Sequence, residues 1–160
     1  MVAKKAFAVA GGLVAIGLLW SVQGAAPETS AAAPPPARTT VLDLDVINDQ
    51  FARTDVGDPG VSLGDEYVFS DQLRQAGRPV GDDGGSCQVT HVDGARITTN
   101  CTLTLRLPDG QLTAQALGVR GEDALMAITG GTGAYRTARG ELHATDIQTP
   151  DEKYRITITF

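Results

Sequence analysis

The chain has 160 residues, 42% of them hydrophobic, which is enough for one folded domain with its own core. Aromatic residues make up only 5%, so Leu, Val, Ile and Ala must form most of that core. The formal net charge is −6 and no basic stripe with interleaved aromatic residues occurs, which argues against nucleic acid and anionic membrane surfaces as partners.

The N-terminal segment has the order of a secretory signal. Lys4 and Lys5 precede an uncharged apolar run at 6–20, and small residues follow it. The run is shorter than the roughly 20 residues that span a bilayer. We expect residues 1–25 to be a signal peptide, cleaved after Gly24 or Ala25, or else an uncleaved membrane anchor. The protein would then be secreted or extracytoplasmic, and it would meet a membrane only through this segment if the signal stays uncut.

Residues 26–40 are rich in Pro, Ala, Ser and Thr, a composition that cannot bury much apolar surface. This segment is interpreted as a linker, which leaves 41–160 as the folded domain. In that part the sequence alternates between apolar and polar residues, as a half-buried strand does, and no segment shows a convincing helical period. The clearest case is the C-terminal stretch "KYRITITF".

Seven or eight short strands can be counted, separated by Gly-rich turns. This spacing indicates an antiparallel sandwich or barrel. Eight strands would close a small barrel whose interior holds side chains or one small ligand. The predicted strands lie at about 41–49, 63–74, 85–92, 96–107, 111–119, 124–129, 139–148 and 153–160.

Cys87 and Cys101 flank a segment with the pattern of a β-hairpin, in which Asp93 and Gly94 supply the turn. If the loop comprises the three residues 93–95, the two cysteines face each other on neighbouring strands. An exported protein would form a disulfide there, worth about 3 kcal/mol in the chain-entropy model. A two-residue turn would shift the register by one residue, and the disulfide would then not follow.

The stretch "AITGGTGAYRTARGEL" at 127–142 contains a glycine run that could be taken for a phosphate-binding loop. A P-loop requires a Gly-Lys pair that leads into a helix, whereas this stretch lacks the pair and continues as a strand. The dinucleotide-binding pattern fails in the same way. We therefore predict a tight turn at Gly130, Gly131 and Gly133 that lets Tyr135 pack back on the domain.

Four stretches in order, "GDEYVFSDQL", "VGDDGGSC", "PDGQLTAQ" and "ITGGTGAYRTARGEL", resemble the signatures of the allene oxide cyclase and dirigent superfamily. The nearest match is its bacterial exported branch with two cysteines, and the resemblance covers about 63–142. It implies an all-β fold, an eight-stranded antiparallel calycin-type barrel, often trimeric, whose lumen binds a hydrophobic small molecule. Members set the stereochemistry of a cyclisation or coupling, and some related bacterial barrels serve [4+2] cyclisations.

The resemblance carries over to single residues unevenly. Asn48 falls where plant allene oxide cyclases have a lumen Asn on the first strand, whereas Val46 occupies the position of their lumen Glu. Asp71 stands in place of the second-strand Asn. Cys87 coincides with the lumen Cys, which a disulfide to Cys101 would make unavailable. The scaffold therefore carries over better than the allene oxide cyclase reaction.

Asp71, Asn48 and Tyr67 are the candidate catalytic residues. A carboxyl group in an apolar lumen would have its pKa raised, which suits a general acid or a group that orients the substrate. Alternatively, Asp71 lies near the barrel mouth and is bonded to a backbone amide or an arginine, and Tyr67 and Phe69 only pack in the core. The predicted substrate-binding residues are Phe69, Leu103, Leu105, Ala114, Ala116 and Gly118.

Other polar residues are less promising. His143 and Glu141 share a strand face opposite the apolar row of Leu142 and Ala144, so we expect a solvated outer pair, although they could also act together on a proton. His91 lies beside a hairpin turn and is expected to be exposed. No nucleophile is paired with a base at a suggestive spacing. Two Cys and two His in the whole chain make a metal site improbable, and we predict no cofactor.

These features predict an exported, cofactor-independent cyclase or isomerase that folds a hydrophobic reactive precursor of polyketide, polyene or oxylipin type, with [4+2] cyclisation in natural-product biosynthesis as one form. Proximity alone could catalyse such a reaction. The alternative is a non-catalytic lumen-binding or structural barrel. The expected partners are a hydrophobic small molecule and further copies of the chain, as a trimer or dimer. A cavity of about 300 Å3 or more lined by Asp71 and Tyr67 would favour a catalyst, and a lumen packed solid would contradict it.

Overall fold

The computed structural model describes residues 38–160. The predicted signal or anchor at 1–25 and nearly all of the predicted linker at 26–40 lie outside this part. Within 38–160 no helix is long and apolar enough to cross a membrane. The elements are β1 (Thr39–Thr54), β2 (Glu66–Gln75), β3 (Arg78–Asp93), β4 (Arg96–Leu107), β5 (Gly110–Val119), β6 (Ala124–Gly131), a 3₁₀ turn η1 (Gly133–Tyr135), β7 (Arg139–Thr145) and β8 (Lys153–Thr159).

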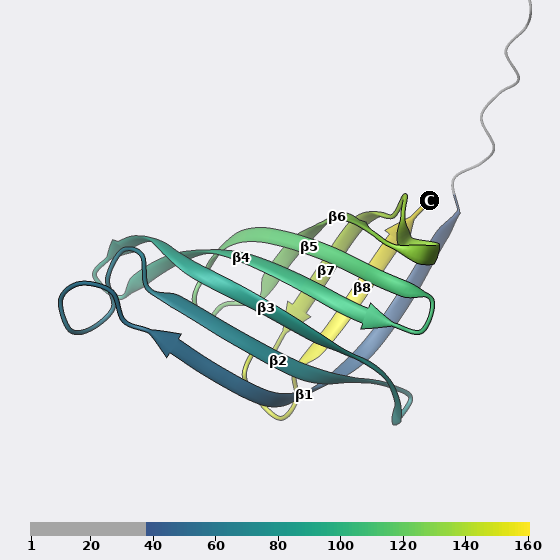
Figure 1. The fold of residues 1–160 in the computed structure, drawn as a ribbon, viewed down its shortest axis with the longest axis horizontal. Helices are drawn as coiled ribbons and strands as arrows, with labels where there is room; N and C mark the ends of the chain where they lie inside the picture. Colours follow the sequence, from purple (N-terminus) through teal and green to yellow (C-terminus); the bar gives the residue numbers. More distant parts are fainter. Residues whose placement is uncertain (1–37) are drawn as a thin grey trace, which may run out of the picture. The chain divides into compact units, whose positions relative to one another are not determined.

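The eight strands form a closed antiparallel barrel in which each strand pairs with its neighbour in sequence and β8 pairs back with β1 (Figure 1). This confirms the predicted fold class. All eight strands occur close to their predicted ranges, and the main difference is that β1 and β3 are longer than expected. Closure pairs every strand with a neighbour on both sides over at least part of its length, which explains how so many short strands stay together without a second sheet.

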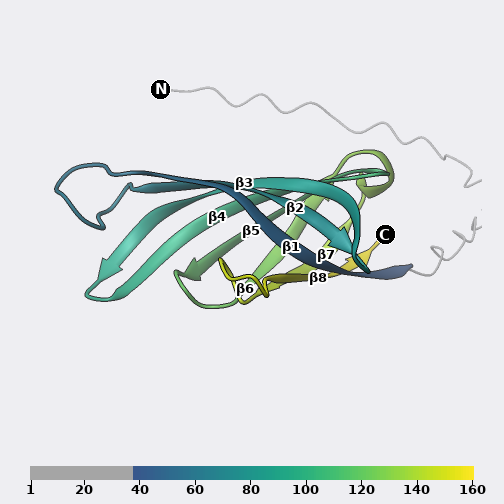
Figure 2. The same cartoon turned by 90° about the horizontal axis from the view of Figure 1, so that it is seen from below.

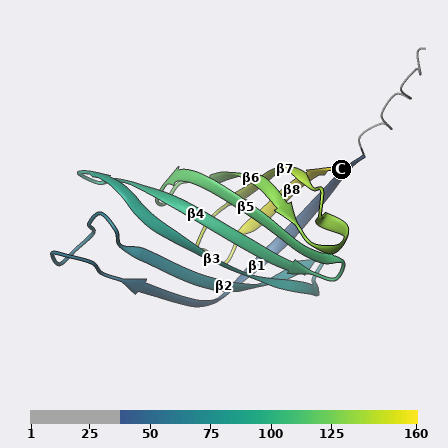
Figure 3. The ribbon, with the colours of Figure 1, turned by 45° about the horizontal axis from the view of Figure 1, so that its top comes forward.

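Strands β1 to β4 extend past the others at one end of the barrel. The pairing of β1 with β8 stops at Asp45, whereas its pairing with β2 continues to Thr54. In Figures 1 and 2 the hairpins β1–β2 and β3–β4 reach beyond β5 to β8 at this end. We call it the extended end, and Figure 3 shows from another angle that the β1–β2 and β3–β4 hairpins reach furthest there.

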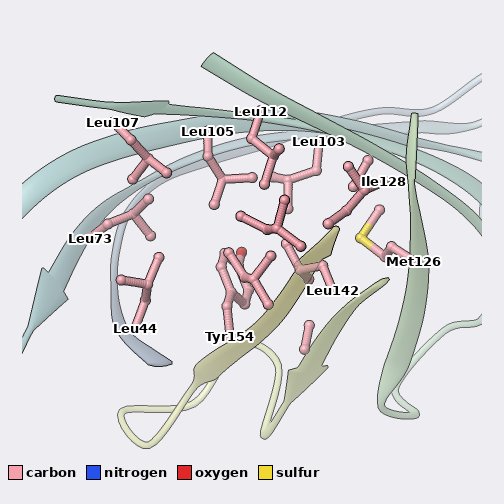
Figure 4. Packing of buried hydrophobic residues seen from close by; sticks show 14 of the residues in the cluster. Leu44, Leu73, Leu103, Leu105, Leu107, Leu112, Met126, Ile128, Leu142 and Tyr154 are labelled. Carbon is pink, nitrogen blue, oxygen red and sulfur yellow. The ribbon is translucent and has the colours of Figure 1, made fainter. Parts of the chain in front are cut away.

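The opposite half of the barrel is filled by aliphatic side chains, as Figure 4 shows. The strands alternate, so every second residue points inward, and those residues make one contiguous core. Its fully buried members include Leu73, Leu105, Leu112, Leu142, Ile156 and Ile158, all at 0% exposure. The β4–β5 turn and the β6–β7 connection close this half.

The cysteine hairpin reaches the expected pairing by a different route. Asp93 pairs with Arg96, so the turn has two residues and not three, which by itself would have misaligned the cysteines. A β-bulge at Thr90 adds one residue to β3 and restores the register, so that Cys87 lies opposite Cys101. The disulfide between them is formed. It closes a loop of the size for which the chain-entropy model gives about 3 kcal/mol.

The glycine run at 130–133 lets two backbone segments approach closely in the packed half of the barrel. Gly131 ends β6, and a Cβ on it would overlap the carbonyl oxygen of Gln111. Gly133 has φ +57° and starts η1, where a Cβ would overlap the carbonyl oxygen of Asp109. Tyr135 ends η1 and packs against the core. The predicted turn is confirmed, and the glycines are there because two backbones approach closely.

Candidate functional site

Three carboxyl side chains meet inside the barrel wall where the packed half gives way to the extended end. Asp71 of β2 and Asp83 of β3 are register partners across the β2–β3 pair. Glu152 immediately precedes β8. Their residues are only 6%, 6% and 5% exposed, respectively, so all three are withdrawn from water. We call Asp71, Asp83 and Glu152 the carboxyl cluster.

Asn48 of β1 connects two members of this cluster. Its Nδ2 donates to Glu152 Oε2 at 2.9 Å and to Asp71 Oδ1 at 3.5 Å. A β-bulge between Asn48 and Gln50 inserts Asp49, whose backbone N–H donates to Asp71 Oδ1 at 3.3 Å. The bulge therefore supplies the cluster with two adjacent donors, the side chain of Asn48 and the backbone N–H of Asp49.

Glu152 is held by the connection between β7 and β8. The backbone N–H of Gln148 donates to Glu152 Oε2 at 2.8 Å. The Glu152 carbonyl accepts a bond from the N–H of Val46 at 3.0 Å, which ties the 146–152 connection to β1. Burial raises the pKa of Glu152, and the bonds from Asn48 and Gln148 oppose this rise because they favour the charged form. Asp71 behaves alike: burial raises its pKa, and the bonds from Asp49 and Asn48 oppose it.

Asp83 differs from the other two because neither of its carboxyl oxygens has a hydrogen-bond partner at ordinary distance, and the nearby Tyr154 hydroxyl only partly offsets the rise in its pKa. Burial raises its pKa to about 8, and the negative charge of neighbouring Asp71 adds to the effect. Within residues 38–160 no Lys or Arg forms an ion pair with any member of the cluster. Asp83 therefore favours its protonated form near neutral pH, and Asp71 and Glu152, which accept hydrogen bonds, are the groups that more readily lose their protons.

Tyr154 of β8 completes the site from the floor of the barrel. It is 3% exposed, and Figure 4 shows its ring rising from β8 into the interior among the core leucines. Burial raises the pKa of Tyr154 above its ordinary value, and the charges of Asp83, Glu152 and Asp71 add to the rise. Tyr154 is consequently a neutral hydroxyl beside the carboxyl cluster, able to donate a hydrogen bond but not to act as a base.

A cavity of about 460 Å3 includes Asp71 and Asp83 in its lining. The lining also includes outward-facing residues of β2 to β4, such as Gln72, Asp82 and Arg106, so the cavity reaches the cluster from the outer side of the wall beside the β1 bulge. Tyr67 is not part of it. This is therefore not the lumen cavity lined by both Asp71 and Tyr67 that was expected of a catalyst, and the packed half of the lumen is filled with leucine and isoleucine.

The structure brings together two of the three predicted catalytic residues. Asn48 and Asp71 are register partners and share a hydrogen bond. Asp71 is bonded to a backbone amide, as the alternative interpretation had it, but it is buried and has no arginine. Tyr67 lies four residues along β2 on the same face, at the extended end, where Phe51 and Arg120 are its neighbours. It does not belong to the carboxyl cluster.

The predicted substrate-binding residues divide into two groups. Leu103, Leu105 and Ala114 are buried in the aliphatic core. The others lie toward the extended end, where Phe69 and Ala116 pack only partly against that core and a Cβ on Gly118 would have no atom within 4 Å. Binding of a substrate by any of these residues stays a prediction, and of the six only Gly118 has open space shown beside it.

Three residues of the site were missed by the sequence analysis: Asp83, Glu152 and Tyr154. Asp83 was part of the quoted stretch "VGDDGGSC", but its inward direction depends on the register between β2 and β3. Among the residues set aside, His91, Glu141 and His143 are exposed, as expected. In residues 38–160 no group of three or more His, Cys, Asp or Glu is arranged to hold a metal ion.

Comparison with protein families gives a match to the "Allene oxide cyclase barrel like domain" over residues 40–160. The chain belongs to this family. The match covers all eight strands and the whole carboxyl cluster, so the resemblance seen in four short stretches extends over the complete barrel. No curated protein matches the chain.

Among solved structures, "Pyocyanin demethylase" is 43% identical to the chain, with a TM-score of 0.72, and the match covers 74% of this chain and 99% of that one. The Diels–Alderase AbmU from Streptomyces koyangensis is 18% identical with a TM-score of 0.59, covering 76% of this chain and 62% of that one. The pterocarpan synthase dirigent protein GePTS1 is also 18% identical, with a TM-score of 0.58, covering 79% and 87%. At such identities, the latter two show the shared fold.

Proposed function

We propose that this family member is a cofactor-independent enzyme that uses the carboxyl cluster to move protons on a planar, nitrogen-containing aromatic substrate of the phenazine class. Two observations support the proposal. Asp83 is a buried carboxyl without a hydrogen-bond partner at ordinary distance, its pKa is raised to about 8, and it lies next to two carboxyls that have donors. The chain is also 43% identical to a pyocyanin demethylase over almost the whole length of that protein.

Pyocyanin is an N-methylated phenazine, and its demethylation can be written with proton transfers and water alone. A carboxylate, Asp71 or Glu152, removes a proton from the methyl carbon, and the C–H electron pair forms an N=CH₂ bond while two electrons enter the ring. Asp83 gives its proton to the second ring nitrogen of the reduced phenazine, across the ring from the N=CH₂ group. Water adds to the N=CH₂ carbon, and collapse releases formaldehyde and a ring N–H. The ring is reduced by two electrons and the methyl carbon is oxidised by two.

Asp83 is the observation that carries the proposal. A carboxyl group that only filled the barrel wall would be expected to have hydrogen-bond donors, because an unpaired buried polar group costs free energy. General acids need a proton near neutral pH, and burial beside a second carboxyl is how a carboxylic acid keeps one. The stronger rise in the pKa of Asp83 supports Asp83 as the acid, and the donors to Asp71 and Glu152 support these two as bases.

The test is turnover of pyocyanin by the purified protein in the absence of oxygen, followed by loss of pyocyanin absorbance and by formaldehyde release. Asp83→Asn and Glu152→Gln should each lower kcat by about 10²- to 10⁴-fold, the usual contribution of an acid or base. Asp82→Asn is the matched control, because Asp82 neighbours Asp83 in the chain but faces outward and pairs with Arg106 at 2.6 Å. Full activity in Asp83→Asn, or equal loss in Asp82→Asn, would refute the proposal.

The predicted cyclisation of a polyketide, polyene or oxylipin-like precursor is a second candidate. The observation in its favour is the open space at Gly118, beside the partly buried Phe69 and Ala116 at the extended end, where a flexible precursor could be held. A linear polyene incubated with the protein should then react faster or with altered stereochemistry, and Asp83→Asn should have little effect. A non-catalytic binder would show saturable binding and no turnover with either substrate. Secretion, trimer or dimer formation and membrane anchoring stay predictions.

A further inference from the structure

Arg120 lies at the end of the inward row of β5. The inward residues of this strand become smaller toward the extended end, from Leu112 through Ala114 and Ala116 to Gly118. Arg120 follows in the same alternation, and its backbone N–H donates to the carbonyl of Ile97 at 2.9 Å. The strand therefore leaves open space and then places a cation at the rim.

The guanidinium of Arg120 is stacked on the ring of Tyr67, with its Cζ 4.7 Å from the ring centroid. Since Tyr67 is on β2 and Arg120 follows β5, this contact crosses the inner face of β3 and β4. In residues 38–160 Arg120 forms no ion pair, unlike nearby Arg96, which lies 3.7 Å from Glu122. A cation in this position has its aromatic partner but no anion.

Tyr67 is 5% exposed, yet its hydroxyl has no hydrogen-bond partner. A buried hydroxyl without a partner is costly unless something else supplies one. The ring of Phe51 lies beside Tyr67, with centroids 6.0 Å apart, and a Cβ on Gly118 would have no atom within 4 Å. An unpaired cation, an unpaired hydroxyl donor, aromatic surface and empty space thus coincide at one place.

We propose that Arg120 and Tyr67 form an oxyanion subsite that selects planar aromatic substrates carrying a phenolate or carboxylate group. The guanidinium and the phenol hydroxyl would both donate to the anionic oxygen, and Phe51 and Phe69 would contact the ring faces. Tyr67 and Asp71 lie on one face of β2, four residues apart, which is about 13 Å of strand. A fused three-ring system with a polar contact at each end could bridge this distance, with its anionic group at Arg120 and the rest of the ring system toward the carboxyl cluster. This inference rests on the proposed function for the substrate class.

The test uses binding of two phenazines that carry no methyl group to remove. Phenazine-1-carboxylate carries the anionic group and unsubstituted phenazine lacks it, and their Kd values can be compared by calorimetry. Arg120→Gln should raise the Kd of phenazine-1-carboxylate by about tenfold or more, the factor expected for loss of one charge-assisted hydrogen bond. Binding of phenazine should change less than about twofold, since the ring contacts remain. Arg136→Gln, at the opposite end of the barrel, is the charge-matched control and should change neither.

Tyr67→Phe separates the hydroxyl from the ring. The variant should raise the Kd of phenazine-1-carboxylate several-fold and leave the Kd of phenazine unchanged. The unliganded protein should be at least as stable as wild type, because the hydroxyl has no partner to lose. Equal weakening of both ligands in Arg120→Gln, or no weakening, would overturn the subsite. Asp83→Asn should leave binding of phenazine-1-carboxylate intact. If Asp83→Asn turns over pyocyanin normally while Arg120→Gln weakens binding of phenazine-1-carboxylate but not of phenazine, the acid role fails and the subsite stands.

Discussion

Asp65 and Asp83 are both buried aspartates in this barrel, but they differ in the hydrogen-bond donors around their carboxyl groups. Asp65, at 0% exposure, ends the β1–β2 loop and accepts bonds from the N–H of Val56 at 2.9 Å, from Ser62 and from Arg53 at 2.7 Å. The backbone bond from Val56, together with Arg53 and Ser62, lowers the pKa of Asp65 to about 2. Asp83 has no donor, and its pKa is raised to about 8.

The contrast shows that burial does not by itself decide what a carboxyl group does. Where the chain supplies donors, the charged form is favoured, and the residue organises a loop. Where donors are missing and a second carboxylate stands opposite, the neutral form is favoured, and the residue keeps a proton. Asp65 therefore has the signature of a structural residue and Asp83 that of a functional one, although the sequence "GDEYVFSDQL" to "VGDDGGSC" does not distinguish them.

The largest expected effect is on the structural side of this comparison. Asp65→Asn keeps the size of the side chain but removes the charge that faces Arg53 and places an NH₂ group among backbone donors. Breaking such a pair should lower Tm by roughly 15 °C. Thermal unfolding measures it, with Asp55→Asn as the control, since exposed Asp55 lies 3.6 Å from the same arginine. Equal Tm values for the two variants would mean that Asp65 does not anchor the loop.

The second expected effect concerns Asp83, where the substitution should raise stability at high pH and not lower it. Its pKa is higher in the folded state than the ordinary 3.8, so the folded protein binds a proton that the unfolded chain has released between about pH 4 and 8. That contribution to stability is complete below about pH 4 and is lost as the pH rises through 8. Asp83→Asn abolishes this loss, so relative to wild type it should gain up to about 4 kcal/mol between pH 5 and pH 9.

Denaturant unfolding at several pH values checks this prediction. Asp82→Asn is the control: Asp82 is half-exposed and pairs with Arg106, which lowers its pKa, so the variant should lose less than about 1 kcal/mol and show no gain at high pH. A wild-type stability that does not fall between pH 5 and 8 would show that Asp83 is ionised. If Asp83→Asn proved both more stable at high pH and inactive, the carboxyl group that lowers the stability of the folded protein would also be the one that activity requires.

The fold could be predicted because it rests on local alternation. A stretch such as "KYRITITF" places Tyr154, Ile156 and Ile158 on one side whatever the neighbouring strands do, so strand positions follow from the sequence itself. Pairing details do not follow in the same way. The Cys87–Cys101 pair was expected from a three-residue turn, and it exists because a two-residue turn and a bulge at Thr90 compensate each other.

The candidate site could be predicted only in part for the same physical reason. Asp71 and Asn48 were identified because family resemblance and strand face both singled them out. Asp83 and Glu152 could not be added, because their meeting depends on the β2–β3 register, on the bulge after Asn48 and on the fold of the 146–152 connection. Each of these is a one-residue choice that alternation leaves open, and a shift of one residue would turn a carboxyl group outward.

The smallest expected effect tests whether donors set the roles within the cluster. Asn48 donates to both Asp71 and Glu152, and both bonds favour the charged forms. Asn48→Ala should therefore raise the pKa of both groups and move the acid limb of the kcat–pH profile to higher pH, with a loss of less than about tenfold at the optimum. The limb set by Asp83 should stay near pH 8, because Asn48 does not contact it.

Gln50→Ala, on the other side of the bulge, is the matched control and should leave both limbs in place. If neither limb moves in Asn48→Ala, the bases of the reaction are not Asp71 and Glu152. If both limbs move together, the three carboxyls titrate as one unit, and the separation of acid from bases by their donors is wrong. Only a shift of the acid limb alone supports the rule drawn from Asp65 and Asp83, that the supply of donors decides which buried carboxyl keeps its proton.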